Sequence, residues 1–407
     1  MTSREKIRHV LMHQPYEGLA IDFGAMRSTG INALAYNKLT EYLGLDRHAV
    51  LYDVFQQIAL PDISVVNRFG GDVMQVHRLC PAFGISIKRW KESRLRDGSK
   101  ATVPFDYNPV PNKSGGLDII GEGGRVVARM PAGGLYFDLV YHKFEHVNTE
   151  AEVSELAFPS VSDEELDFME CQSRELYENT DKAILLCFGG NIFEQGQLDF
   201  GYEKFYTDLV LNPGMLHAYF TRLTDAYLED LRKILAKVGR YVDVIQFGDD
   251  LGTQISSQIS VDMYRSMIMP YHQKLYAFVR GHYPGVSVFL HSCGAISALL
   301  PSLVEAGVQV LNPVQISAKD MDPRALKREF GKDLVFWGGG ADMQNLVTYG
   351  DPEAIRNHVG ELIDIFNADG TGFVFTQVHN IQYGIAPEKV CAVYDTARAY
   401  AAGRCGC

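Results

Sequence analysis

The stretch Val286-Ser-Val-Phe-Leu-His-Ser-Cys-Gly294 joins an apolar run to two residue types that bind metals. The branched and apolar residues 286–290 predict a buried strand, and residues 295–306 predict a helix. Because side chains alternate along a strand, His291 and Cys293 should point the same way. An imidazole nitrogen and a thiolate are ligands that zinc prefers. The alternative is ordinary packing, in which a buried cysteine acts as a small hydrophobic residue.

Strands and helices alternate on both sides of this stretch. Strands are predicted at 19–23, 72–77, 183–188, 242–247, 286–290, 308–311, 334–337 and 373–376. Helices are predicted at 3–13, 32–42, 62–69, 163–179, 203–210, 213–238, 261–282, 295–306, 322–330, 352–367 and 387–402. Repeated strand–helix units require parallel strands with right-handed crossovers, and eight strands is the count of a (β/α)₈ barrel. A doubly wound sheet is the alternative, but no GxGxxG follows the first strand. We therefore predict an α/β fold, a TIM barrel that forms a single domain over residues 1–407.

Residues 81–145 differ in composition from the rest of the chain. Glycine, proline, asparagine and charged residues interrupt short alternating pieces, which predict hairpin strands at 85–88, 125–129 and 135–140. The segment is too rich in aromatic residues for disorder. We expect a β-rich insertion in the barrel, acting as a lid or as a docking face for a partner.

Composition limits the class of protein. The chain has 407 residues, a formal net charge of −12 and a pI near 5.5. This acidity, with no basic stripe, argues against nucleic-acid binding. No apolar run reaches the roughly 18 to 20 residues that a membrane span needs. The seven cysteines are scattered and odd in number, which argues against a disulfide framework and for a reducing, cytoplasmic compartment.

Polar residues follow most of the predicted strands. In a TIM barrel the loops after the strands form the active-site face, so these residues should converge on one rim. We predict substrate contacts from residues in these loops: Arg27, Asn191, Asn312, Gln315 and Gln377. For Arg27, the alternative to clamping a carboxylate is a pair with Asp22 or another acidic neighbour.

His379 is the best candidate for a third metal ligand. It follows the last predicted strand, across the barrel mouth from His291 and Cys293, and three protein ligands with one open position is the catalytic arrangement of zinc. The alternative is that His379 binds a substrate or a neighbouring residue. Weaker candidates are Asp250, Glu194, Cys391 and the terminal pair Cys405 and Cys407, where a mobile tail is the simpler interpretation.

Several motifs carry a family resemblance between about residues 180 and 395. They are Val242-Asp-Val-Ile-Gln-Phe-Gly-Asp-Asp-Leu-Gly252, Met269-Pro-Tyr-His272, His291-Ser-Cys293, Val335-Phe-Trp-Gly-Gly-Gly340, and His379-Asn-Ile-Gln382 followed by Ala386-Pro-Glu-Lys-Val390. With these motifs the chain resembles the uroporphyrinogen decarboxylase superfamily, and within it the cobalamin-dependent methyltransferase branch. That branch carries a His-x-Cys and a later cysteine as zinc ligands. His379 stands near the position of the later cysteine.

The resemblance implies a zinc-dependent methyltransferase. It would move a methyl group between a small methylated or methoxylated substrate, or a thiol, and the cobalt of a corrinoid on a separate protein. This chain has no Asp-x-His-x-x-Gly cobalamin signature. Asp249, Asp250 or Glu194 would exchange a proton with the heteroatom, although Asp249 and Asp250 serve equally well as a helix-capping pair. Demethylation is the direction we favour, and the resemblance also suggests a homodimer.

Two other functions compete with this one. Uroporphyrinogen decarboxylases are metal-free lyases that act on a polycarboxylate, but they carry two arginines near the first strand, where this chain has only Arg27. Such an enzyme would leave His291 and Cys293 unexplained. A third possibility is a barrel that docks a corrinoid protein without catalysis.

Overall fold

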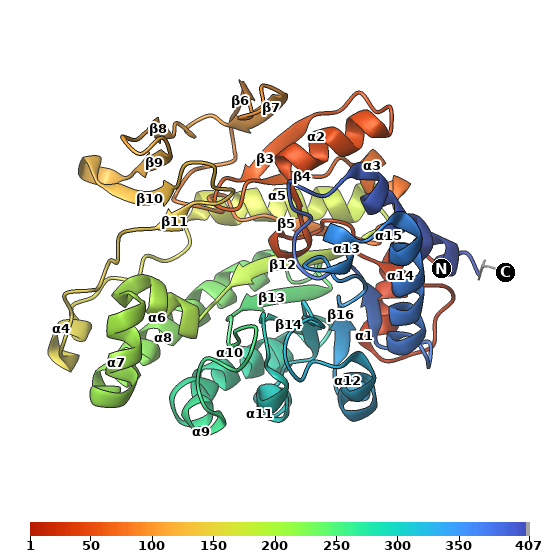
Figure 1. Cartoon of the computed structure of the whole chain (residues 1–407). Helices are drawn as coiled ribbons and strands as arrows, with labels where there is room; N and C mark the ends of the chain where they lie inside the picture. The colour runs from red at the N-terminus through yellow and green to blue at the C-terminus, as the bar shows by residue number, and fades with distance from the viewer. Residues whose placement is uncertain (404–407) are drawn as a thin grey trace.

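The computed structural model describes residues 1–403 and contains eight parallel strands arranged as a barrel, with helices around it (Figure 1). Neighbouring strands pair in the order β1-β17-β16-β15-β14-β13-β12-β5. Their bounds are β1 Ala20–Ile21, β5 Val73–Val76, β12 Ala183–Gly189, β13 Val244–Gly248, β14 Ser287–His291, β15 Val310–Asn312, β16 Val335–Trp337 and β17 Phe373–Phe375. Each of the eight predicted strands is present, and the predicted (β/α)₈ fold is confirmed.

The strands form the inner layer because their side chains alternate between two buried faces. One hydrophobic cluster fills the barrel and includes Val73, Leu185, Val244 and Phe289. Helix α1 (Ser3–Leu11) contributes Ile7 and Val10 to this same cluster, and thereby covers the amino-terminal end of the barrel. The opposite end, where the strands finish, remains for a site.

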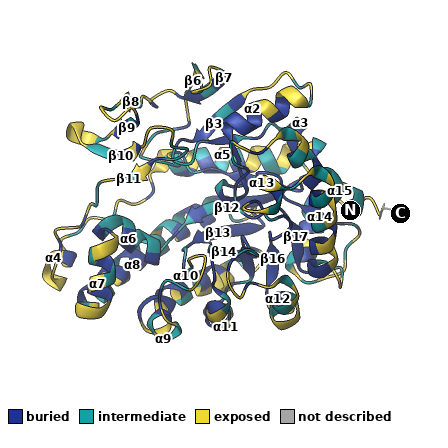
Figure 2. Ribbon diagram, in the orientation of Figure 1, coloured by how far each residue is buried: buried dark blue, intermediate teal, exposed yellow. Residues whose placement is uncertain are grey.

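Helices cover the outside of the strands and turn their buried sides toward them (Figure 2). The outer helices are α5 Asp163–Asn179, α8 Pro213–Val238, α10 Met269–His282, α11 Leu300–Ala306, α12 Pro323–Phe330, α14 Pro352–Phe366 and α15 Pro387–Ala401. Shorter ones are α2 Ala33–Tyr42, α3 Ile63–Arg68, α4 Glu150–Ser154, α6 Phe193–Phe200, α7 Tyr202–Leu211, α9 Val261–Met263 and α13 Leu346–Tyr349, with single turns η1 Arg27–Thr29, η2 Glu122–Gly124 and η4 Ser297–Leu299. In the described part of the chain no helix is both long and apolar enough to cross a membrane.

Besides the short helices α4 and α13, which were not predicted either, two features of the helices depart from the predictions. Helix α6, directly after β12, was not predicted, because glycine and glutamine interrupt its short apolar pattern. The predicted helix 261–282 is divided into α9, a π-helical turn at Tyr264–Ile268 and α10. Pro270 lies at the start of α10 and lacks the amide hydrogen that an uninterrupted α-helix would use. Both departures lie beside the site described below.

Between β1 and β5 the barrel closes through one residue, Asp72, rather than through a paired length of strand. Asp72, just before β5, donates its backbone N–H to Ile21 O at 2.7 Å. Its carboxylate accepts a hydrogen bond from Ile21 N at 2.9 Å and pairs with Lys6 Nζ at 3.0 Å. Ser3 Oγ, on α1, donates to the other carboxylate oxygen at 2.8 Å. Asp72 therefore joins β1, β5 and α1.

The segment 81–145 contains six strands in two antiparallel groups, β6 Trp90–Arg94, β7 Lys100–Pro104, β8 Val110–Pro111, β9 Leu117–Ile120, β10 Val126–Met130 and β11 Asp138–Leu139. In Figure 1 they lie beside α2 at the upper left. The strand expected at 85–88 is not formed; only an isolated bridge joins Ala82 and Ile85. Strands β2 Ile31–Asn32, β3 Ala49–Asp53 and β4 Ile58–Leu60, which were not predicted, complete one sheet in the order β2-β4-β3-β7-β6. The β-rich segment is therefore continuous with the first sixty residues.

Replacing Asp72 tests the closure of the barrel. Asp72→Ala leaves Ile21 N and Lys6 without their partner, and we expect a loss of about 3–5 kcal/mol in the free energy of unfolding, the cost of breaking a buried ion pair. Urea unfolding followed by circular dichroism measures it. Asp395→Ala, which removes a half-exposed pair with Arg68, should cost less than about 1 kcal/mol. Equal losses in the two variants would contradict this role for Asp72.

Candidate metal centre

Three side chains converge at the carboxyl ends of the strands. His291 ends β14, Cys293 lies two residues further on, and His379 follows β17. One potential ligand atom from each lies within 4.8 Å of the other two, and His291 Nε2 is 3.4 Å from Cys293 Sγ. Zinc bonds of about 2.0 Å to nitrogen and 2.3 Å to sulfur, at a tetrahedral angle, place those two atoms about 3.5 Å apart. The three residues predicted as metal ligands are thus brought together with a spacing that fits zinc.

Asn312 orients the ring of His291. The register of β14 and β15 places His291 directly beside Asn312, and His291 Nδ1 lies 2.7 Å from Asn312 Oδ1. Asn312 Nδ2 donates to Trp337 O at 2.7 Å, which identifies Oδ1 as the acceptor. His291 Nδ1 therefore carries the proton, and Nε2 presents its lone pair to the neighbouring ligands. Asn312, predicted to bind substrate, is fully buried and contacts the candidate ligand His291.

His379 is held by Gln377 and by its own backbone. Its φ of 59° lies in the left-handed region, which few residues other than glycine adopt without support. Gln377 Nε2 donates to His379 O at 2.8 Å and to Thr29 O at 2.9 Å, and Tyr394 Oη donates to Gln377 Oε1. Burial, together with the neighbouring His291, lowers the pKa of His379 to about 4. The ring is therefore neutral at pH 7, which is the form that binds a metal.

Carboxylates surround the thiol of Cys293. Asp250 Oδ1 accepts the backbone N–H of Cys293 at 2.8 Å and lies 3.6 Å from His291 Nε2. Burial, and then the charges of Asp250 and Glu194, raise the pKa of Cys293 well above its ordinary value. A divalent cation would offset this excess of negative charge. Gln315 Oε1, which accepts the N–H of Gly294 at 2.8 Å, holds the same loop.

Asp249 is fully buried, and both oxygens of its carboxylate accept hydrogen bonds from the protein. Its two carboxylate oxygens accept the backbone N–H groups of residues 192, 193 and 194 at 2.8–2.9 Å. These are free donors at the start of α6, so Asp249 acts as a cap from another strand. His272 Nε2 lies 2.8 Å from Asp249 Oδ2, and His272 Nδ1 lies 3.1 Å from Tyr264 Oη. The π-helical turn thus aligns a buried Tyr264–His272–Asp249 chain that positions α6.

Glu194, the second residue of α6, faces the acidic side of the site. Asn191 Nδ2 donates to Glu194 Oε2 at 2.5 Å. Burial, followed by the charges of Asp250 and Asp249, raises the pKa of Glu194 well above its ordinary value. This shift favours the protonated form of Glu194 over the carboxylate. Asn191, predicted to contact substrate, fixes this acid.

Arg27 is engaged within the protein. Its Nε forms an ion pair with the buried Asp53, and its Nη2 donates to Pro81 O at 2.8 Å. Asp22, the other partner considered for it, instead accepts the indole N–H of Trp337 at 2.8 Å. Arg27 is thus paired with an acidic neighbour, and about a third of its side chain remains exposed.

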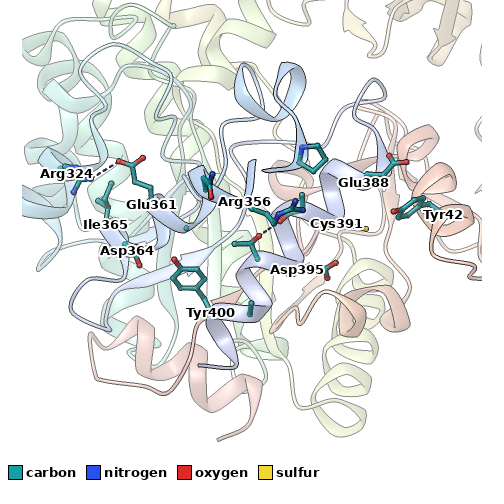
Figure 3. A pocket seen from close by; sticks show the side chains of 16 residues that line it. Tyr42, Arg324, Arg356, Glu361, Asp364, Ile365, Glu388, Cys391, Asp395 and Tyr400 are labelled. Carbon is teal, nitrogen blue, oxygen red and sulfur yellow. Dashed lines mark hydrogen bonds and ion pairs between the residues drawn. The ribbon is translucent and has the colours of Figure 1, made fainter. Parts of the chain in front are cut away.

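The remaining cysteine candidates lie away from this site or outside the described residues. Cys391, on α15, borders a pocket of about 920 Å³ between α14 and α15 (Figure 3). Charged side chains, including the pair Arg324 and Glu361, line that pocket, and it contains none of the three candidate ligands. Cys405 and Cys407 belong to residues 404–407, beyond the described part of the chain.

The uroporphyrinogen decarboxylase (URO-D) family model matches residues 192–400, which is about half of the chain. This chain belongs to the uroporphyrinogen decarboxylase family. Two uroporphyrinogen decarboxylases support the assignment: one from Chloroherpeton thalassium is 22% identical over 62% of this chain and 69% of its own length, and one from Chlorobaculum tepidum is 24% identical over 60% and 66%. The fold of a methyltransferase from Methanosarcina mazei matches 98% of this chain and 99% of that protein, with a TM-score of 0.63 and 12% identity. The predicted family resemblance is confirmed, and the last comparison shows a shared fold.

Sequence reasoning missed His272 and Tyr264, which in this member of the family support Asp249 from a helix. The motif Met269-Pro-Tyr-His272 was noted only as part of the resemblance. Pro270 within a helical pattern was the available signal, because it predicts an irregular turn. No pattern in the sequence identifies the contact between His272 and Asp249, which are 23 residues apart.

Loss of the Asn312 side chain tests the support of His291. In Asn312→Leu the ring is free to rotate and to change tautomer, so zinc affinity should fall about 10- to 100-fold, the usual cost of removing a group that orients a ligand. Competition with a chromogenic chelator measures that affinity. Asn345→Leu is the control, because Asn345 lies on the same rim but bonds to Asp342. Equal affinities for the Asn312 variant and the unaltered protein would contradict the assignment.

Proposed function

We propose that this protein is a zinc-dependent methyltransferase. It moves a methyl group between a small methylated or methoxylated substrate, or a thiol, and the cobalt of a corrinoid carried on a separate protein. The observation that supports this most strongly is that potential ligand atoms of His291, Cys293 and His379 lie close together. The proton on His291 Nδ1 points away from them, toward Asn312. The fold shared with a methyltransferase is consistent with the proposal.

His291 Nε2, Cys293 Sγ and His379 would hold the zinc ion. When bound, zinc supplies a Lewis acid that makes the heteroatom of the substrate a better leaving group or, for a thiol, a better nucleophile. Asn312 keeps the lone pair of His291 directed at the site, and Asp250 holds the backbone at Cys293. These supports keep the ligands in place while a partner approaches the open end of the barrel.

Glu194 is the candidate proton donor. It is buried, its pKa is raised by that burial and by Asp250, and Asn191 holds it, so its protonated form can give a proton to the oxygen or sulfur that loses its methyl group. Asp249 is fully buried and positions Glu194 by accepting hydrogen bonds from the start of α6. Asp249 is therefore proposed as a positioning residue, and Glu194 with Asp250 as the groups next to the reacting atoms.

A metal-free decarboxylase is the second candidate, because the curated relatives carry that name. In this chain Arg27 is already paired with Asp53, so it offers weak recognition of a polycarboxylate. This alternative predicts activity that chelators do not affect and a large loss in Arg27→Ala. The methyltransferase proposal predicts the opposite pair of results.

Metal content tests the proposal directly. Purified protein should contain one zinc ion per chain, and Cys293→Ala should lose both the metal and methyl transfer to a corrinoid protein, because the thiolate is the strongest ligand of the three. Elemental analysis and the change in corrinoid absorbance measure these. Cys391→Ala is the matched control and should keep both. Full zinc content in Cys293→Ala would exclude the proposed ligand set.

The pH dependence tests Glu194. Since its protonated form is the donor and its pKa is raised, the rate should be constant at low pH and fall as pH rises through that pKa. Glu194→Gln should lower the rate by about 10²- to 10⁴-fold and remove this pH-dependent fall. Glu203→Gln, on α7, should leave the profile unchanged. An unaltered profile in the Glu194 variant would show that another group supplies the proton.

A further inference from the structure

Three polar side chains lie inside the barrel, below the metal centre. Gln75 pairs in register with Leu185, and Gln246 pairs with Phe289 one layer below His291. Leu185 and Phe289 belong to the cluster that fills the barrel, so their register partners face the same interior. His77 lies directly after β5 and two residues after Gln75, so the alternation of the strand directs it to the same side.

Each of these side chains contains an enclosed polar atom without a partner. Gln75, His77 and Gln246 are at least nine-tenths buried, and Gln75 Oε1, His77 Nδ1 and Gln246 Oε1 have no hydrogen bond. The hydroxyl of Tyr52, whose ring lies against His77 at 4.5 Å, has none either. Buried polar groups are almost always bonded, so these atoms are open to a partner other than the protein itself. A ligand can supply the missing bonds.

There is open space beside them. Gln75 and His77, but not Gln246, border a pocket of about 350 Å³ that Phe23 after β1 and Gln172 on α5 also line. With no protein partner, a glutamine amide can turn either its oxygen or its nitrogen toward a ligand. The region therefore offers both donors and acceptors.

The charges of the region select an uncharged ligand. Two neighbouring cations are already paired: Arg27 with the buried Asp53, and Lys88, which lines the pocket, with Glu164. Burial lowers the pKa of His77 to about 4 and raises that of Tyr52 well above its ordinary value. Both are neutral at pH 7, so an ionised group bound here would lack a counter-charge.

We propose that Gln75, His77 and Gln246 form a subsite for the uncharged, hydrogen-bonding end of the methyl-bearing substrate, such as a hydroxyl group. This inference rests on the proposed function, since it places the methyl-bearing heteroatom at the metal centre and the polar end deeper in the barrel. It defines the substrate class as a neutral methoxy or methyl compound with a second oxygen.

A matched series of small probes tests this class. The probes 2-methoxyethanol, methoxyacetate and 2-methoxyethylamine share a methyl ether and differ in whether the other end is neutral, negative or positive. Their binding to the full-length, zinc-supplemented protein is measured by saturation-transfer NMR, which requires no turnover. We expect 2-methoxyethanol to bind most tightly. Tighter binding of either ionised probe, or no binding of 2-methoxyethanol, would overturn the proposal.

Two variants separate ligand binding from structural roles. Gln246→Leu and Gln75→Leu remove the unpartnered amides, so each should weaken 2-methoxyethanol binding about tenfold while raising the melting temperature of the free protein. Thr224→Val is the control, because Thr224 Oγ1 on α8 is likewise buried without a partner; it should change stability alone. Lower melting temperatures in the glutamine variants, or unchanged probe binding, would show that these amides are structural and overturn the subsite.

The zinc content of the same samples distinguishes this inference from the proposed function. Selective probe binding that depends on Gln75 and Gln246 in a protein that takes up no zinc would support the subsite and refute the metal chemistry. Zinc binding and methyl transfer that are unaffected in the glutamine variants would support the chemistry and refute the subsite.

Discussion

The register of three neighbouring parallel strands is the constraint on which the site depends. It places Gly248, His291 and Asn312 side by side at the carboxyl ends of β13, β14 and β15. Gly248 has no side chain, and a Cβ there would meet Asn191 at 2.6 Å. Asn312 holds the imidazole of His291 through Nδ1. A shift of one residue in this pairing would turn each of these side chains to the opposite face of the sheet.

The polar rim of the barrel acts mainly as a scaffold. Asn312, Gln315 and Gln377 were predicted from their positions after strands to contact substrate, yet each forms hydrogen bonds within the protein. They hold a ligand ring, a loop and a strained backbone turn, respectively. Amides suit this task because each combines a donor and an acceptor and carries no charge that must be neutralised when buried. Precise positions for a few reacting groups require many such supports.

The fold could be predicted from the sequence because local signals agree with the global arrangement. The eight apolar runs were recognisable as strands, and the His-x-Cys at the end of one of them indicated a metal centre. Other features depend on contacts that are distant in sequence. Strand β3 pairs with β7 about fifty residues away, and the capping of α6 by Asp249 comes from another strand. The role of His272 depends on a π-helical turn whose position no simple periodicity predicts.

The proposed metal centre has two imidazoles and one thiolate that share a zinc ion at the mouth of the barrel. Zinc K-edge X-ray absorption of the zinc-loaded protein tests it most directly, because sulfur and nitrogen ligands differ in bond length. We expect one sulfur at about 2.3 Å and two imidazole nitrogens at about 2.0 Å, with the sulfur shell absent from Cys293→Ala. A first shell without sulfur, or one that is the same in the variant, would contradict it.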